Sequence, residues 1–424
     1  MTLQEKDVLH IWHPYTQIKN APSVIPIIKA QGSLLYDEND GQYIDAISSW
    51  WVNIHGHSHP YIAEKIYQQA LRLEHVIFAG FTHEPAVNLG SRLLSKLPGM
   101  SKIFFSDNGS TATEVAIKMA LQYFSNYGSQ RKKIIALENS YHGDTFGSMS
   151  ISSRNIFTSP FEDKLFDVRF IPKPTRENVK ETIAQLGNCD DIACFIYEPL
   201  LQGAGGMIMY EPEALDELLG FMHHKEILCI ADEVLTGFYR TGTMFASDQL
   251  YNKPDIICLS KALTGGTMAL GVTLCTQSIY DGFIHDDKTK TFFHGHSFTA
   301  NPIACAASLA SLDLLESENC LEQINWICKE QFKFVNELKN SNYPIKTKNH
   351  RSCGTIAAFE VSNAMSDNYL NNVSQKFTRF ALTNGVYLRP LGNTIYIMPP
   401  YCITGEELKK TYAVITEYLN ENED

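Results

Sequence analysis

The stretch that decides the fold runs from Ile192 to Lys261 and holds three short apolar runs: IACFIY (192–197), ILCIA (227–231) and IICL (256–259). An amphipathic stretch, Pro212 to His223, lies between the first two runs, and a further β-like run covers Lys132 to Leu137. Short apolar runs that alternate with helical patterns are typical of parallel strands covered by helices on both faces. The sequence therefore predicts an α/β fold with a mainly parallel central sheet.

Each of the three runs is followed at once by a group that can do chemistry. Glu198 follows the first run, Asp232 the second and Ser260-Lys261 the third. The carboxyl ends of parallel strands meet at one edge of a sheet, where open α/β sheets bind their ligands. A buried charge is costly unless it is paired or used, so each residue alone is equally well explained by a structural ion pair. The set on successive strands favours a cofactor site.

A candidate anion site lies in the segment SDNGSTATE (106–114), whose apolar residues continue into a helix with helical spacing. Gly109 and Ser110 then lie at the helix N-terminus, where free N–H groups and the helix dipole suit an anion, although many helices begin this way without a ligand. Together with an aspartate and a lysine, such a site indicates pyridoxal phosphate (PLP). The lysine amine reacts with the cofactor aldehyde, and the aspartate keeps the pyridine nitrogen protonated. Tyr141 offers a ring that stacks on the cofactor or packs in the core.

The residues around the aspartate and the lysine resemble the signature of the class III (ω-amino acid) aminotransferases. Asp232-Glu233-Val234 is followed by Gly237 and Arg240-Thr241-Gly242, and Ser260-Lys261 completes the order. The resemblance covers nearly the whole chain and implies fold type I of the PLP-dependent transferases. It implies a large PLP-binding domain at 56–315 and a small α+β domain built from both termini, 1–55 and 316–424. This domain fits extended signals at 25–28 and 34–36, strand-like segments at 355–361 and 394–398, and helical patterns at 321–338 and 405–421.

Further motifs narrow the resemblance to members that convert 8-amino-7-oxononanoate to 7,8-diaminononanoate in biotin biosynthesis. These motifs are WHPYTQ (12–17), SSWW (48–51), GFTHEP (80–85), RPLG (389–392) and YIMPPY (396–401). The resemblance implies that Tyr15 and Trp50 line the substrate pocket and that Arg389 binds the substrate carboxylate. A guanidinium fork suits that role on physical grounds, because it can bind both carboxylate oxygens at once. Without the family context, core packing explains the tryptophans equally well.

The same resemblance assigns the cofactor-binding residues. Lys261 is the catalytic residue, which bonds to the cofactor and then moves a proton during the reaction. Asp232 pairs with the pyridine nitrogen. The remaining contacts are Val234 and Tyr141 on the two ring faces, and Gly109 and Ser110 on the phosphate.

The segment before Asn301-Pro302 bears on the partner subunit and on the amino donor. The resemblance implies that Ser297 reaches the phosphate in a partner subunit, so that two chains form a homodimer with shared active sites. Members that use S-adenosylmethionine read like Gly-Pro-Thr here, whereas this chain reads Gly295-His296-Ser297. Gly295 is a predicted substrate-binding residue, but the histidine changes the wall where the donor should lie. S-adenosylmethionine is the expected donor, and lysine is the alternative.

Other functions remain as alternatives. Leu235 stands where ornithine and aminobutyrate transaminases tend to have glutamine, which argues against those substrates, but another ω-amino acid transaminase stays possible. QGAGGM (202–207) faintly resembles a dinucleotide loop and would suit a nicotinamide-dependent oxidoreductase. A non-catalytic regulator of the same fold is disfavoured because both Lys261 and Asp232 are retained.

Composition excludes several other classes. The net charge of −12 is a poor basis for binding nucleic acid. No stretch approaches the ~20 apolar residues of a membrane span, and the N-terminus lacks a signal pattern. Ten cysteines without a CxxC pair indicate reduced, buried thiols, so we expect a cytoplasmic protein. The alternating histidines of HGHSHP (55–60) have the spacing of a metal site, but no further ligand completes it and no metal is predicted.

Overall fold

The structure is a computed structural model that describes residues 1–362 and 372–421. Its strands are β1 Ile27–Gln31, β2 Leu34–Asp37, β3 Gln42–Asp45, β4 Met100–Ser106, β5 Lys133–Leu137, β6 Arg169–Ile171, β7 Ile192–Tyr197, β8 Leu201–Gln202, β9 Ile208–Met209, β10 Leu228–Asp232, β11 Ile256–Leu259, β12 Gly271–Thr276, β13 Thr347–Cys353, β14 Ile356–Val361, β15 Val386–Tyr387 and β16 Thr394–Ile397. Its α-helices are α1 Leu3–His10, α2 Ser48–Trp51, α3 Pro60–Arg72, α4 Glu84–Lys96, α5 Gly109–Asn126, α6 Phe146–Ile151, α7 Val179–Leu186, α8 Pro212–His224, α9 Gln277–Asp281, α10 Pro302–Leu315, α11 Glu318–Asn340, α12 Asn372–Thr383 and α13 Gly405–Asn420.

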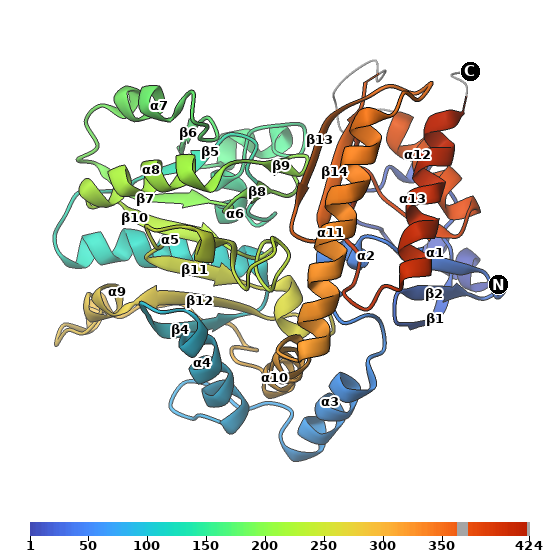
Figure 1. Ribbon diagram of the computed structural model, residues 1–424. Coiled ribbons are helices and arrows are strands. Elements are labelled where there is room, and N and C mark those ends of the chain that lie inside the picture. Colours follow the sequence, from blue (N-terminus) through green and yellow to red (C-terminus); the bar gives the residue numbers. More distant parts are fainter. Residues whose placement is uncertain (363–371, 422–424) are drawn as a thin grey trace.

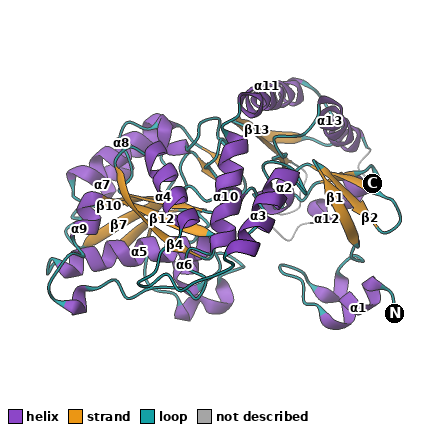
Figure 2. Cartoon of the chain, turned by 90° about the horizontal axis from the view of Figure 1, so that it is seen from below, coloured by secondary structure: helices purple, strands orange, loops and turns teal. Residues whose placement is uncertain are grey.

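A seven-stranded sheet forms the centre of the larger part of the molecule, with the order β4-β12-β11-β10-β7-β5-β6. Neighbours from β11 to β6 pair in parallel, whereas β12 is antiparallel to both β11 and β4. Helices lie on both sides of these strands, as Figure 2 shows. The predicted mainly parallel sheet is therefore present, with one reversed strand that the sequence patterns did not reveal.

The apolar runs are buried on both faces because successive side chains of a strand point to opposite sides. In β7, Phe195 and Tyr197 join the core cluster that contains the buried leucines of α8. Cys194 and Ile196, which alternate with them along the strand, join a second cluster that includes the apolar face of α5. This two-sided burial explains why the runs lack polar alternation. The parallel pairing of β7, β10 and β11 places their carboxyl ends at one edge of the sheet.

The two ends of the chain meet in the smaller part of the molecule, on the right in Figure 1. The N-terminal strands β1, β2 and β3 form a four-stranded sheet with β15, in which Val386 of β15 pairs in parallel with Ile44 of β3. The strands β13, β14 and β16 form a separate antiparallel sheet, against which α11 packs. The domain boundaries at 55/56 and 315/316 stay a prediction.

The structure differs from the sequence expectations in several details. Asp232 is the last residue of β10 and does not follow it. The glycine-rich 202–207 segment connects β8 to β9 in a small antiparallel pair and opens no helix, unlike a dinucleotide-binding loop. Residues 52–59 form a loop with one isolated bridge at His57, so the histidines at 55, 57 and 59 do not lie together on one strand. Within the described ranges, no helix combines the length and apolar character needed to cross a bilayer.

Candidate active site

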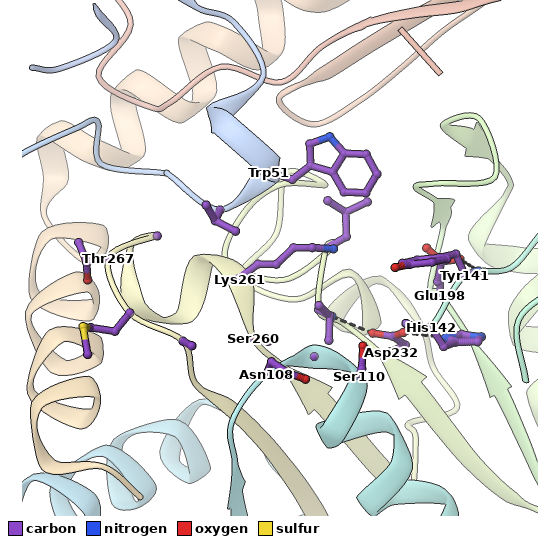
Figure 3. A pocket seen from close by; sticks show the side chains of 18 residues that line it. Trp51, Asn108, Ser110, Tyr141, His142, Glu198, Asp232, Ser260, Lys261 and Thr267 are labelled. Atoms are coloured by element: carbon purple, nitrogen blue, oxygen red, sulfur yellow. Dashed lines mark hydrogen bonds and ion pairs between the residues drawn. The ribbon is translucent and has the colours of Figure 1, made fainter. Parts of the chain in front are cut away.

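Three neighbouring strands deliver the candidate catalytic groups to one cavity. Asp232 ends β10, Glu198 directly follows β7, and Lys261 lies two residues beyond β11. All three line a cavity of about 430 Å³, within the size range of small-molecule sites. In Figure 3, Lys261 extends into this cavity beneath Trp51, and Tyr141, Asp232 and His142 lie on the opposite side. The predicted grouping at the sheet edge is thus what the structure shows.

Lys261 presents an amine that the protein leaves available. Within the described part of the chain no hydrogen bond or ion pair holds its Nζ, which lies 4.9 Å from the centre of the Trp51 ring. Burial and the nearby Arg240 lower the pKa of this amine, although Asp232 and Glu198 act in the opposite direction. Its backbone has φ of +44°, a strained conformation for a residue with a side chain. A lowered pKa favours the neutral, nucleophilic amine.

Asp232 is buried and paired with a histidine that the sequence patterns did not identify. Its Oδ2 lies 2.7 Å from Nδ1 of His142, and its Oδ1 accepts the backbone N–H of Val234 at 3.1 Å. Among the residues that the structure describes, none forms a hydrogen bond with the buried Nε2 of His142. With Nδ1–H donated to the carboxylate, the histidine orients Asp232. His142 adjoins Tyr141, and that adjacency was the only available signal.

Glu198 fastens two loops around the cavity. Its carboxylate accepts the backbone N–H of Tyr141 at 3.0 Å and that of Gly203 at 2.9 Å. Burial raises the pKa of Glu198 to about 7, with the charge of Asp232 adding to the effect. The next acid along β10, Glu233, points elsewhere and binds the backbone N–H groups of Ala246 and Ser247. Glu198 therefore belongs to the site, whereas Glu233 is structural.

The N-terminus of α5 forms the candidate anion site. Asn108 caps the helix by accepting the N–H of Thr111 at 3.0 Å, and Gly109 and Ser110, the first two residues of the helix, line the cavity. A Cβ added to Gly109 would approach a methyl group of Val234 to 2.8 Å. A Cβ on Gly143, whose φ is +135°, would approach Oγ of Ser110 to 2.1 Å. Both glycines thus keep this cradle open.

A second cavity of about 880 Å³ adjoins the first and shares Trp51, Tyr141 and Lys261 with it. Tyr15, Trp50 and Arg389 also line this cavity, so the three predicted pocket residues come together from distant parts of the chain. The Tyr15 and Trp50 rings are 5.6 Å apart, and the Arg389 guanidinium lies 5.1 Å from the centre of the Trp50 ring. Among described residues, no hydrogen bond or ion pair occupies the Arg389 guanidinium.

The hydroxyl of Tyr15 connects the N-terminal segment to the first cavity. It donates to Asp144 and lies 3.4 Å from the hydroxyl of Tyr141. Burial, together with these neighbours, raises the pKa of Tyr141 far above its ordinary value. Asp144 lies three residues after Tyr141 in the sequence but was not predicted as a site residue.

Two predicted residues lie away from both cavities. Gly295 and Ser297 sit on an exposed segment of this chain and line neither cavity. Of the histidines at 55–59, His55 contacts Oγ of Ser311 at 3.0 Å and His57 contacts Oδ2 of Asp45 at 2.9 Å, so these two serve as structural contacts.

One group of possible metal ligands does assemble elsewhere among the described residues: His223, Cys229 and Asp255. Of these three, Cys229 is in β10, near the opposite end of that strand from Asp232. Its contacts are an ion pair of 3.5 Å between His223 and Asp255 and a hydrogen bond from the Cys229 backbone to Asp255.

Nearly the whole chain matches one known protein family. The family model for class-III aminotransferases matches residues 15–419, and the chain belongs to that family. It is an aminotransferase, and the predicted α/β fold of type I transferases is confirmed by its structural neighbours.

Individual relatives are more specific. An adenosylmethionine-8-amino-7-oxononanoate aminotransferase from Synechococcus elongatus is 44% identical, with 97% of this chain and 99% of the relative covered. The crystal structure of the enzyme of that name from Methanocaldococcus jannaschii gives a TM-score of 0.92 at 34% identity, with 98% of each chain covered. A PLP-bound amine transaminase from an uncultivated Pseudomonas species gives a TM-score of 0.89 at 27% identity, covering 96% of this chain and 97% of that one.

Proposed function

We propose that this aminotransferase uses PLP to convert 8-amino-7-oxononanoate to 7,8-diaminononanoate, a step of biotin biosynthesis, with S-adenosylmethionine as the amino donor. The observation that carries the proposal is the pair of adjoining cavities. One holds the amine, the carboxylate and the anion cradle. The other holds a guanidinium among aromatic rings, with no hydrogen bond or ion pair from a described residue. The relatives named for this reaction support the choice of substrates.

The residues of the first cavity fit PLP. The cofactor, when bound, draws electrons away from the carbon that carries the transferred amino group. Lys261 supplies the amine and afterwards moves the proton at that carbon. Asp232, oriented by His142, holds a proton on the pyridine nitrogen. The free N–H groups of Gly109 and Ser110 receive the phosphate, and Val234 and Tyr141 enclose the ring.

The second cavity fits a long aliphatic substrate that ends in a carboxylate. Tyr15 and Trp50 provide an apolar wall, and Phe157 extends it with a ring 5.8 Å from that of Tyr15. Arg389 offers a bidentate partner for the carboxylate. Because Lys261 lines the same cavity, the opposite end of the substrate can reach the amine.

The proposal is tested by incubating the purified enzyme with 8-amino-7-oxononanoate and a panel of amino donors. We expect 7,8-diaminononanoate to form with S-adenosylmethionine. A half-reaction without the acceptor identifies the donor separately, because the donor alone converts the bound aldehyde form of the cofactor to its amine form. Conversion by lysine and not by S-adenosylmethionine would make lysine the donor. Failure with every donor would reject the acceptor.

Replacement of Arg389 by alanine should raise the KM for 8-amino-7-oxononanoate by about 10–100-fold, because charge-assisted hydrogen bonds of about 1.5–3 kcal/mol are lost. The kcat should change less, since the carboxylate that the guanidinium would bind is at the opposite end of the substrate from the reacting carbon. The KM of Arg389→Lys should lie between those of the wild type and Arg389→Ala, because an ammonium lacks the planar fork. The exposed Arg176 provides the control, as Arg176→Ala should leave KM unchanged. An unaltered KM in Arg389→Ala would remove Arg389 from the substrate site.

We also propose a homodimer with shared active sites. The exposed positions of Gly295 and Ser297 outside both cavities of their own chain support this arrangement. Phe293 and Phe298, beside them, are 74% and 60% exposed, which a second copy would cover. The cytoplasmic location stays a prediction.

A further inference from the structure

A row of four titratable side chains joins helix α5 to the exposed segment 291–300. Nζ of Lys118, on α5, lies 2.8 Å from Nδ1 of His294. Nε2 of His294 lies 3.1 Å from Nε2 of His296. The row ends at Asp107, whose Oδ2 lies 3.6 Å from Nδ1 of His296. Asp107 directly precedes Asn108, the N-cap of α5, so one end of the row lies on α5 and the other lies just before that helix begins.

The chemistry of the donors assigns one tautomer to each ring. An ammonium has no acceptor, so Nδ1 of His294 accepts from Lys118 and carries no proton. The neutral His294 ring then has its proton on Nε2 and donates it to Nε2 of His296. His296 therefore carries its proton on Nδ1, facing Asp107 at a distance that is long for a hydrogen bond but attractive electrostatically. The contacts run in one direction, from the cation to the carboxylate.

Neither ring can accept a second proton without breaking a contact. A proton on Nδ1 of His294 would face the Lys118 ammonium, and a proton on Nε2 of His296 would face the N–H of His294. Burial lowers the pKa of His294, and the charges of Lys118 and His296 lower it further.

Two carboxylates face the pair, and one of them, Glu114, opposes the lowering of the His294 pKa. Glu114 of α5 raises the pKa of His294 against these effects, but Oε1 of Glu114 also accepts the backbone N–H of Gly147 at 2.8 Å. Asp107 faces His296. A metal ion between the two Nε2 atoms fits poorly, because His294 would then carry its proton on Nδ1 against Lys118.

We propose that His294 and His296 are positioning residues that fasten the 291–300 segment to α5 while both rings are neutral, and that protonation releases it. The consequence for the active site rests on the proposed function. Gly295 and Ser297 flank His296, so release of the segment would displace the serine expected to reach the partner subunit's phosphate. The contacts among the four side chains do not depend on which substrate the enzyme converts, and Gln122 of α5 also binds the start of the segment at the Thr291 carbonyl.

The sign of the pH dependence follows from the lowered pKa of His294. Fastening is complete above the ordinary histidine pKa of about 6.5. It is lost as the pH falls from that value through the lower pKa of the folded state. The sensitive range therefore lies on the acidic side of neutrality.

Hydrogen–deuterium exchange of the cofactor-loaded full-length enzyme, read by mass spectrometry on peptides from 291–300, tests this proposal. After correction for the intrinsic effect of pH, exchange in the wild type should rise about threefold or more between about pH 8 and about pH 6. In Lys118→Met and His294→Ala the segment should already exchange faster at the higher pH, with little further rise. Lys118→Arg, which keeps a cationic donor, should stay protected.

Two controls keep the result interpretable. His285→Gln changes an exposed histidine in the same connection between α9 and α10 and should behave like the wild type. Peptides from α11 should exchange equally in every variant, which shows that the fold is intact. Equal protection of 291–300 in the wild type, Lys118→Met and His294→Ala at the higher pH overturns the proposal, as does wild-type protection that ignores pH. Because no substrate is present, this result is independent of whether the enzyme aminates 8-amino-7-oxononanoate.

Discussion

Replacing Lys261 with alanine is expected to abolish transamination, with a loss of at least about 10⁴-fold in kcat. Among the described residues, Lys261 is the one lysine that lines both cavities. Alanine at this position removes both the nucleophile and the group that moves the proton. Trp51, which contacts the amine, should keep its position because a smaller side chain leaves space without a clash. Steady-state assays with 8-amino-7-oxononanoate measure the effect.

A second measurement separates chemistry from binding. Borohydride reduction of the PLP-loaded wild type should add the mass of the reduced cofactor to the peptide that contains residue 261, whereas Lys261→Ala should gain none. Lys132→Ala, at an exposed position, is the matched control and should keep both activity and labelling. Turnover retained in Lys261→Ala, or label found on another lysine, would mean that the catalytic amine lies elsewhere.

Asp232→Asn is expected to lower kcat/KM by about 10²–10³-fold, the range for loss of a preorganised electrostatic partner. Asparagine can still accept the Nδ1–H of His142 through its oxygen, so the buried contact survives while the negative charge is lost. The melting temperature should therefore change little compared with the activity. Asp190→Asn, at an exposed site, should match the wild type in both measurements.

The contrary outcome for Asp232 is equally clear. An Asp232→Asn enzyme with kcat/KM within about twofold of the wild type would show that no charge at this position is needed. A large loss of melting temperature, with activity lost in proportion, would instead assign Asp232 and His142 a purely structural role.

Much of the large sheet could be predicted because its strands are buried on both faces. The runs at 192–197 and 256–259 match β7 and β11 residue for residue. By contrast, β12 escaped prediction because it breaks the strand–helix alternation. It follows β11 after a connection too short for a parallel crossover, so it pairs antiparallel. The strand β4 escaped too, as its burial is mostly partial.

Residues of the site could be predicted only where they belong to a recognisable local motif in the sequence. His142 was missed because its partner Asp232 is 90 residues away, and no local pattern connects them. The adjacent tryptophans show the same limit. Trp51 contacts Lys261 and Trp50 contacts Arg389, since Ser49 and Trp50 have non-helical backbone angles that turn the two rings apart. Such a turn depends on the packing around it, so two adjacent tryptophans in the sequence do not reveal it.

The parallel pairing of β3 with β15 has a consequence for synthesis on the ribosome. One edge of β3 lacks its partner strand until β15 is translated, about 340 residues later. Tyr15 and Trp50 emerge early, but the wall that Arg389 completes exists only when translation is nearly finished. Lys261 and all strands of the seven-stranded sheet are therefore translated well before Arg389 can complete the second cavity, so a nascent chain released early would carry the amine without the guanidinium.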